Sequence, residues 1–164
     1  MVLRPTFNET WMQVAFVVAQ RSTCIRHKLG AVIIKDNNLL STGYNGAANG
    51  IVSCDKKGFC LKDKLKQESG KYGDRDCHAV HAEVNAIIRC GWNDLQGSTL
   101  FTIMSPCHDC AKIIINSGIK QVYYAKEYDD KRSFGLFFES DVTITGLNIC
   151  DYVEKQWGEI KIKI

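Results

Sequence analysis

The sequence predicts an α/β fold whose sheet contains parallel strands, and three observations indicate it. A helical pattern near the N-terminus is followed by a β-hairpin over 30–44. Two β-rich segments, 98–104 and 121–125, are then separated by a helical segment, and a short helix leads to a last strand at 142–145. Strands joined through a helix pair in parallel with right-handed crossovers. At 164 residues the chain can bury one core without disulfide bonds, so we expect a single domain, 1–164.

The first helix is predicted by a capping signal and by helical spacing. Thr6 followed by Glu9 matches a capping box. Apolar side chains then recur at the helical period: Phe7, Trp11, Val14, Ala15, Val18 and Ala19. We expect this amphipathic helix to end near Ser22.

The hairpin is predicted by a β-branched run that is interrupted and then resumes. Residues 30–35 form the first strand, Asp36-Asn37-Asn38 the turn, and 39–44 the second strand. Thr42-Gly43-Tyr44-Asn45-Gly46 then closes the second strand with turn-forming residues. Asn45 either only makes this turn or offers its amide to a sugar hydroxyl, and composition favours neither reading.

The later elements are predicted from periodicity and capping residues. A helix is expected to begin at or near His81 and to end at Cys90-Gly91, where glycine suits a left-handed cap. Ser105 and Pro106 are expected to supply the N-cap and first turn of a helix that carries Cys107 and Cys110. That helix should end at Ser117-Gly118, and a short helix should span 133–139.

The core is expected over about 6–145, and a C-terminal tail, 146–164, follows it. The tail carries Trp157 and an alternating apolar series at Ile160, Ile162 and Ile164. It either adds an edge strand or docks on a neighbouring chain.

Two short segments, His81-Ala82-Glu83 and Pro106-Cys107-His108-Asp109-Cys110, carry the chemistry. The His81 imidazole and the thiolates of Cys107 and Cys110 make three metal ligands, which leave the fourth position of tetrahedral zinc open for water. Residues two apart in mid-helix point about 200° away from each other. Glu83 can therefore lie beside the open position only if His81 stands at the start of a helix. The pattern predicts a hydrolytic zinc site with Glu83 as its proton-transfer group.

Two other readings of these segments remain open. Cys-x-x-Cys alone also occurs as a thioredoxin-like redox pair, although that motif does not call for an upstream His-x-Glu. A zinc-stabilised binding module without turnover is the second alternative. Glu83 argues against it, because a purely structural site needs no carboxylate beside an open position.

Composition narrows the functional classes. The net charge of +3 is small and no run of like charges stands out, so nucleic acid is not expected as a ligand. The longest apolar runs fall far short of a membrane span, and the N-terminus does not resemble a secretory signal. We expect a soluble, cytoplasmic protein. Small anions remain candidate ligands, with Arg26, Lys28, Lys71 and Arg75 near the motifs.

The stretch 46–80 is long and irregular, and it is rich in cysteine. Long loops in compact domains are usually functional or disordered. Four thiols, from Cys24, Cys54, Cys60 and Cys77, could form a closed four-thiolate zinc site that pins this loop. The alternative is four buried free thiols. Cys90 is expected in the core.

These motifs together resemble the deoxycytidylate deaminase family, within the cytidine-deaminase-like zinc superfamily. The resemblance runs from about Phe16 to Thr145. It rests on Arg21-Ser22-Thr23-Cys24, Gly30-Ala31-Val32, Gly43-Tyr44-Asn45-Gly46, His81-Ala82-Glu83-Val84-Asn85-Ala86-Ile87, and Ser105 to Lys112. The His-x-Glu and Pro-Cys-x-x-Cys elements belong to the whole superfamily. The Gly-Tyr-Asn-Gly turn and the string after His81 favour the deoxycytidylate branch.

The resemblance implies a three-layer α/β/α sandwich around a mixed five-stranded sheet. It implies hydrolysis of dCMP to dUMP and ammonia, which contributes to the dTTP supply, in a homohexamer or other homo-oligomer. Allosteric control by dCTP as activator and dTTP as inhibitor is implied too, with Mg²⁺ accompanying the triphosphate. We expect Asn45, Ala82 and Ser105 to contact the substrate, and Arg26 is a candidate for its phosphate.

The expected reaction is attack of zinc-activated water on C4 of the pyrimidine. Two thiolates offset the charge of the ion, so a base is required. Glu83 would take the water proton, deliver it to ring N3 and then protonate the departing amine. The alternatives are a dual dCMP/dCTP deaminase and a tRNA or polynucleotide deaminase of the same superfamily. A riboflavin-pathway deaminase is less favoured, because no residues remain for a reductase domain.

Overall fold

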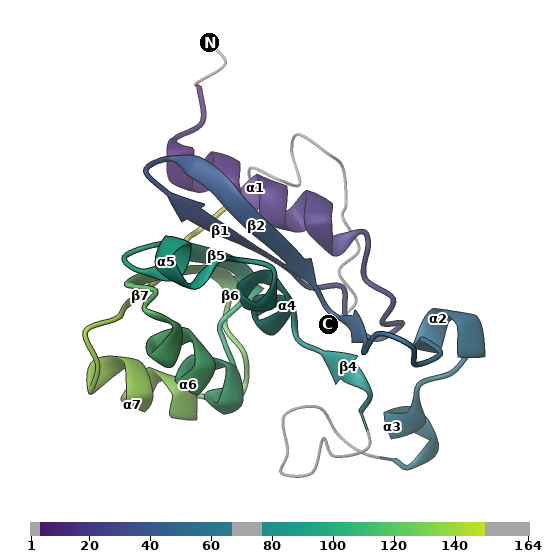
Figure 1. The fold of residues 1–164 in the computed structure, drawn as a ribbon. Coiled ribbons are helices and arrows are strands. Elements are labelled where there is room, and N and C mark those ends of the chain that lie inside the picture. The colour runs from purple at the N-terminus through teal and green to yellow at the C-terminus, as the bar shows by residue number, and fades with distance from the viewer. Residues whose placement is uncertain (1–3, 67–76, 150–164) are drawn as a thin grey trace.

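The structure is a computed structural model, and it describes residues 4–66 and 77–149. Five strands form one mixed sheet in the order β2-β1-β5-β6-β7 (Figure 1). The strands are β1 (Gly30–Lys35), β2 (Asn38–Tyr44), β5 (Thr99–Met104), β6 (Gln121–Lys126) and β7 (Thr143–Gly146). β1 is antiparallel to β2 and β5, whereas β5, β6 and β7 run parallel. The predicted α/β class and mixed five-stranded sheet are confirmed.

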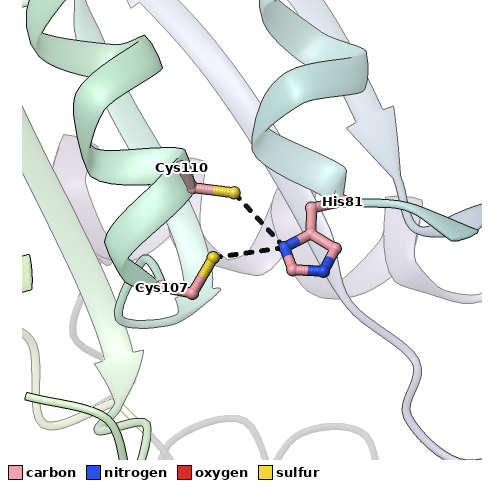
Figure 2. A group of neighbouring side chains, drawn as sticks. All are labelled: His81, Cys107 and Cys110. Atoms are coloured by element: carbon pink, nitrogen blue, oxygen red, sulfur yellow. Dashed lines mark hydrogen bonds between the residues drawn. The ribbon is translucent and has the colours of Figure 1, made fainter. Parts of the chain in front are cut away.

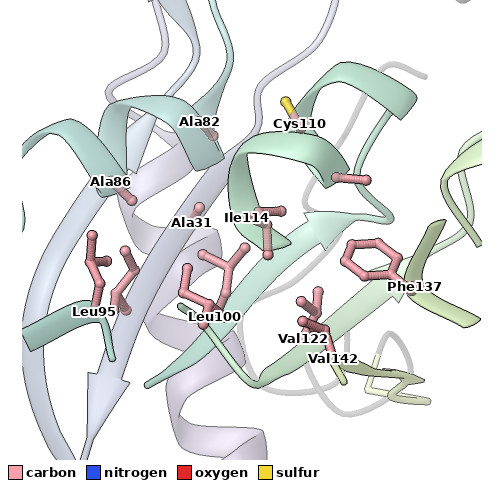
Figure 3. Packing of buried hydrophobic residues seen from close by; sticks show 13 residues of the cluster. Ala31, Ala82, Ala86, Leu95, Leu100, Cys110, Ile114, Val122, Phe137 and Val142 are labelled. Carbon is pink, nitrogen blue, oxygen red and sulfur yellow. The ribbon is translucent and has the colours of Figure 1, made fainter. Parts of the chain in front are cut away.

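Helices cover both faces of this sheet. They are α1 (Phe7–Ala19), α4 (Ala82–Ile88), α5 (Trp92–Leu95), α6 (His108–Ser117) and α7 (Arg132–Phe138). On one face, α1 buries Met12 and Phe16 against Val32 and Phe101. On the other, the remaining helices form a second core with β1, β5 and β6, in which Ile114 of α6 is fully buried (Figure 3). These are the three layers of an α/β/α sandwich. None of the helices in the described segments is long and apolar enough to cross a membrane.

The composition of β1 explains why both faces are covered. Successive side chains of a strand point to opposite faces. Ala31 and Ile33 belong to the core under α4 and α6, whereas Val32 and Ile34 belong to the core under α1. A strand that is apolar at every position needs a helix layer on each side.

The predicted N-terminal cap and hairpin are confirmed. The Thr6 hydroxyl accepts a hydrogen bond from the Glu9 backbone N–H at 3.2 Å, and the Glu9 carboxylate accepts one from the Thr6 backbone N–H at 2.6 Å. In the hairpin, Asp36 and Asn37 have φ values of 49° and 59°. Two left-handed residues in a two-residue loop twist the strands in the favoured sense.

Two predicted helix termini were wrong. The N-cap of α6 is Cys107, not Ser105, because the Ser105 hydroxyl instead accepts the backbone N–H of Tyr128 at 2.8 Å. Gly91 does not cap α4 in a left-handed conformation. The helix ends earlier, with Arg89 as its C-cap, and Gly91 is the N-cap of the short α5, which was not predicted.

The stretch 46–80 contains short elements where an irregular loop was predicted. They are β3 (Gly46–Ala47), α2 (Cys54–Lys57), α3 (Leu61–Lys64) and β4 (Ala79–Val80). β3 pairs with β4 in antiparallel fashion, and β4 leads directly into His81. This pairing fixes the chain immediately before α4. Lys71, Arg75 and the tail series Trp157, Ile160, Ile162 and Ile164 lie outside the described residues, and so does Cys150.

Helix α4 lies directly on β2 at Gly43. A Cβ at this position would lie 2.1 Å from the backbone oxygen of Ala82 and 2.4 Å from the backbone nitrogen of Ala86. Both contacts are to helix backbone, which cannot move aside as a side chain can. The missing side chain of Gly43 therefore sets the distance between the helix and the sheet.

Gly43→Ala is predicted to destabilise the fold by about 1–3 kcal/mol or more, because α4 must move away from β2. The midpoint of urea unfolding measures this change. Gly135→Ala is the matched control, since no atom of the described residues lies within 4 Å of a Cβ there and alanine favours the helix α7. Equal stability of the Gly43→Ala variant and the wild type would contradict the packing described here.

Candidate metal centre

Three potential metal ligands converge where α4 and α6 begin. His81 is the N-cap of α4, Cys107 is the N-cap of α6, and Cys110 lies in the first turn of α6. The Nδ1 atom of His81 lies 3.3 Å from Sγ of Cys110 and 3.5 Å from Sγ of Cys107 (Figure 2). Within the described ranges, these residues form the one group of three potential ligands whose donor atoms all lie within 4.8 Å of one another.

The donor set and its spacing fit zinc. Zinc–nitrogen and zinc–sulfur bonds of about 2.1 and 2.3 Å at tetrahedral angles separate the two donor atoms by about 3.6 Å. The observed separations of 3.3 and 3.5 Å are close to this value. Three protein ligands leave one tetrahedral position for water or substrate, which is the arrangement of catalytic rather than structural zinc.

The two thiols affect each other's pKa, and one of them is a thiolate ligand for a cation at neutral pH. The hydrogen bond with Cys110 is the main cause that lowers the pKa of Cys107 to about 4, and the His81 imidazole lowers it further. The same hydrogen bond and burial raise the pKa of Cys110 well above its usual range. Metal binding requires both sulfurs as thiolates, so a bound cation would favour deprotonation of both cysteines.

Glu83 lies beside the ligands without being one of that group. Its side chain is only 6% exposed, and its Oε2 atom lies 3.9 Å from Sγ of Cys110. His81 precedes the helix with an extended backbone, φ −69° and ψ 155°, so residues 81 and 83 can face the same space. Burial is the main cause that raises the pKa of Glu83, and the nearby imidazole partly opposes it. A carboxyl with a raised pKa can both accept and return a proton near neutrality.

A pocket opens at this centre, and several separate parts of the chain form its walls. His81, Glu83 and Cys107 line one part of it. The other walls come from the segment after α1 (20–29), the turn at Asn45, the cysteine-bearing stretch (46–80) and the connection after β6 (127–131). Ala82, expected as a substrate contact, is fully buried in the core and does not line this pocket. Lys28 is not among the lining residues either.

Asn45 holds one wall of the pocket in place. Its Oδ1 atom accepts hydrogen bonds from the Ser22 hydroxyl at 2.6 Å and from the Leu29 backbone N–H at 2.9 Å. Its Nδ2 atom donates to the backbone oxygen of His27 at 2.9 Å. The amide thus crosslinks the segment that carries Arg26 and lines the pocket. A contact with substrate stays a prediction.

Ser105 holds another wall. Its hydroxyl accepts the Tyr128 N–H, and its own N–H donates to the backbone oxygen of Lys126 at 2.8 Å. These bonds tie the strand before the cysteine ligands to the end of β6 and the connection after it, where Lys126 and Tyr128 line the pocket. Neither residue was predicted from the sequence. The signal was their place at the carboxyl end of a parallel strand, where ligands commonly bind.

The four cysteines of the second predicted zinc site line the same pocket. Burial is the main cause that raises the pKa of Cys54, and the proximity of Cys60, Cys24 and Cys77 raises it further. The structure thus brings the four thiols into one neighbourhood. They do not form a group of three with donor atoms within 4.8 Å, a statement that covers the described residues.

Comparison with known proteins gives concordant results. Residues 5–126 match the family model described as the cytidine and deoxycytidylate deaminase zinc-binding region. The deoxycytidylate deaminase of Mycobacterium phage D29 is 42% identical over 125 residues, covering 76% of this chain and 98% of the relative. That of Enterobacteria phage T4 is 35% identical over 153 residues, covering 75% of this chain and 79% of the relative. The dCMP deaminase of cyanophage S-TIM5, solved in complex with dCMP and dUMP, aligns with a TM-score of 0.69 and 29% identity over 89% of this chain and all of that one.

Cys107→Ser is predicted to remove one zinc equivalent per chain, because a serine hydroxyl is a far weaker ligand than a thiolate whose pKa is already lowered. Metal analysis of protein purified with zinc measures the loss. Cys90→Ser is the matched control, since Cys90 belongs to no ligand group among the described residues and should keep the wild-type content. Equal zinc content in both variants would show that this centre does not hold the ion.

Proposed function

Because this chain belongs to the cytidine and deoxycytidylate deaminase family and is a deaminase, we propose that it hydrolyses dCMP to dUMP and ammonia. The observation that carries the proposal is the buried carboxyl of Glu83 beside a three-ligand centre. The substrate is supported by the names of the relatives and by the dCMP and dUMP complex of the cyanophage enzyme.

The proposed cofactor is zinc, held by His81, Cys107 and Cys110. Zinc bound there would act as a Lewis acid and supply an activated water at neutral pH. The thiolates lie at the N-terminus of α6, a ten-residue helix whose dipole stabilises negative charge. The dipole thus favours the thiolate forms of these cysteines, which a cation needs as ligands.

Glu83 is the proposed proton carrier. The reaction adds water across the N3=C4 bond of the pyrimidine, with oxygen to C4 and a proton to N3. The C4–amine bond then breaks and the amine leaves as ammonia with the second proton, so protons must reach ring N3 and the departing amine. A buried carboxyl with a raised pKa can accept a proton from water and pass it to each nitrogen in turn. Burial also keeps bulk water from competing for these protons.

Regulation, assembly and location remain part of the proposal. We expect dCTP to activate and dTTP to inhibit, with Mg²⁺ bound to the triphosphate, in a homohexamer or other homo-oligomer. Such an enzyme would act in the cytoplasm and contribute to the dTTP supply. These features are supported by the motifs that place the chain in the deoxycytidylate branch.

The second zinc ion is proposed at Cys24, Cys54, Cys60 and Cys77. The proposal is supported by the shared neighbourhood of the four thiols, and binding would have to draw their sulfurs closer together. The zinc content of the Cys107→Ser variant distinguishes the alternatives. One remaining equivalent supports a site in the cysteine-bearing stretch, whereas none counts against it.

We expect dCMP to be deaminated with a kcat/KM about 10- to 100-fold higher than that of deoxycytidine, because a charge-assisted contact to the phosphate is absent from the nucleoside. Loss of cytosine absorbance with dCMP, deoxycytidine, CMP and dCTP measures the preference. Single-stranded DNA and tRNA serve as the rival substrates. Equal rates on nucleoside and nucleotide would contradict the nucleotide assignment, and a preference for polynucleotide would favour an editing enzyme.

Glu83→Gln is predicted to keep its zinc and to lose about two to four orders of magnitude in kcat, because the amide cannot carry the proton. Metal analysis and the same absorbance assay provide the two readouts. Glu127→Gln is the control, since Glu127 is an exposed carboxylate of the same pocket, held by Lys131. Retained turnover in Glu83→Gln refutes the assigned role.

A further inference from the structure

Asn85 is a residue of α4 whose side chain joins two strands. Its Nδ2 atom donates to the backbone oxygen of Tyr44 at 2.8 Å and, over a longer distance of 3.4 Å, to that of Val80. Its backbone N–H donates to the backbone oxygen of His81 at 3.0 Å, the ordinary bond of an α-helix. Asn85 does not line the pocket. It therefore acts on the pocket only through the residues that it holds.

Both acceptors of the Asn85 amide immediately precede residues of the candidate site. Val80 is the last residue of β4, and the ligand His81 follows it. Tyr44 is the last residue of β2, and it is followed by Asn45, whose own amide holds one wall of the pocket. One side chain thus connects the backbone before a metal ligand with the backbone before a pocket wall.

The two strands separate at the point where this amide lies. Gly46 of β3 pairs with Val80 of β4, and the described register of that small sheet ends at this pair. On one side the chain continues into the five-stranded sheet, where Tyr44 lies opposite Gly30. On the other side it enters α4 with His81 as the N-cap. The amide therefore bridges the two segments where their backbone pairing stops.

An amide nitrogen suits these two acceptors. It offers two hydrogens in fixed directions on one atom, whereas a hydroxyl offers one and a carboxylate none. Both neighbours are carbonyl oxygens, which only accept, so the nitrogen rather than the oxygen of the amide faces them. A Cβ on Gly43 would lie 2.9 Å from the backbone carbon of Asn85, and this close packing keeps the amide against the strands.

We propose that Asn85 is a positioning residue that orients His81 for metal binding and fixes the Asn45 wall relative to it. The inference rests on the proposed zinc centre and deaminase function, and it adds a residue that supplies no ligand atom. Removing a residue that orients a metal ligand typically weakens metal binding by about 10- to 100-fold. Because Asn85 bonds to the backbone before His81 and not to the imidazole, we expect the lower end of this range.

The test compares Asn85→Leu and Asn85→Ala with the wild type. Both variants lose the two donors, but only the first keeps the side-chain volume. Both should bind zinc about tenfold more weakly in competition with a chromophoric chelator, and Co²⁺ at this centre should show altered ligand-field absorption bands. Subtracting the spectrum of Co²⁺-loaded Cys107→Ser isolates the bands of this centre. Asn116 is exposed in α6 and does not line the pocket, so Asn116→Leu and Asn116→Ala should match the wild type.

The metal measurements need no turnover, so they separate this inference from the proposed function. If the wild type binds zinc but deaminates neither dCMP nor deoxycytidine, the function is overturned, and weaker zinc binding by the Asn85 variants still supports the positioning role. The urea midpoint of the zinc-free protein measures stability separately. A lower midpoint with unchanged zinc affinity and an unchanged Co²⁺ spectrum would show a purely structural role and overturn the inference. A loss confined to Asn85→Leu would overturn it too, because overpacking and not the missing donors would then be the cause.

Discussion

The structure depends on the close approach of helix α4 to the sheet. Gly43 lets the backbone of α4 lie directly on β2, and the β3–β4 pairing fixes the chain before the helix. Together they place the imidazole of His81 within 3.5 Å of two thiols at the start of α6. Because the ligands come from two helices, the packing of each helix on the shared sheet determines the distances between the ligand atoms.

The same arrangement gives the two cysteine thiols and the Glu83 carboxyl different roles. The hydrogen bond with Cys110 lowers the pKa of Cys107, whereas burial keeps the pKa of Glu83 above its usual range. Thiolate ligands reduce the charge of the ion, so proton transfer falls to the carboxyl. Metal binding and proton transfer are thus assigned to neighbouring but chemically different groups.

The sequence was sufficient for the main strands and helices, which follow local patterns, and for the grouping of His81 with Cys107 and Cys110, which follows from the resemblance of their motifs to a known family. The apolar run of β1 and the offset of His81 and Glu83 are properties of neighbouring residues. The walls of the pocket were not predictable in this way. Arg26, Lys62 and Tyr128 come together only through tertiary packing. Ser105 was misread because its hydroxyl bonds to the distant Tyr128 N–H rather than to its own helix.

The proposed reaction requires one ion held by His81, Cys107 and Cys110 with its fourth position open. Anomalous diffraction at the zinc edge, from crystals of the zinc-loaded protein grown with and without dUMP, tests this directly. We predict an anomalous peak between these three side chains, with a non-protein atom in the fourth position and Glu83 beside it. A peak elsewhere only, or a fourth protein ligand that closes the centre, would contradict the account.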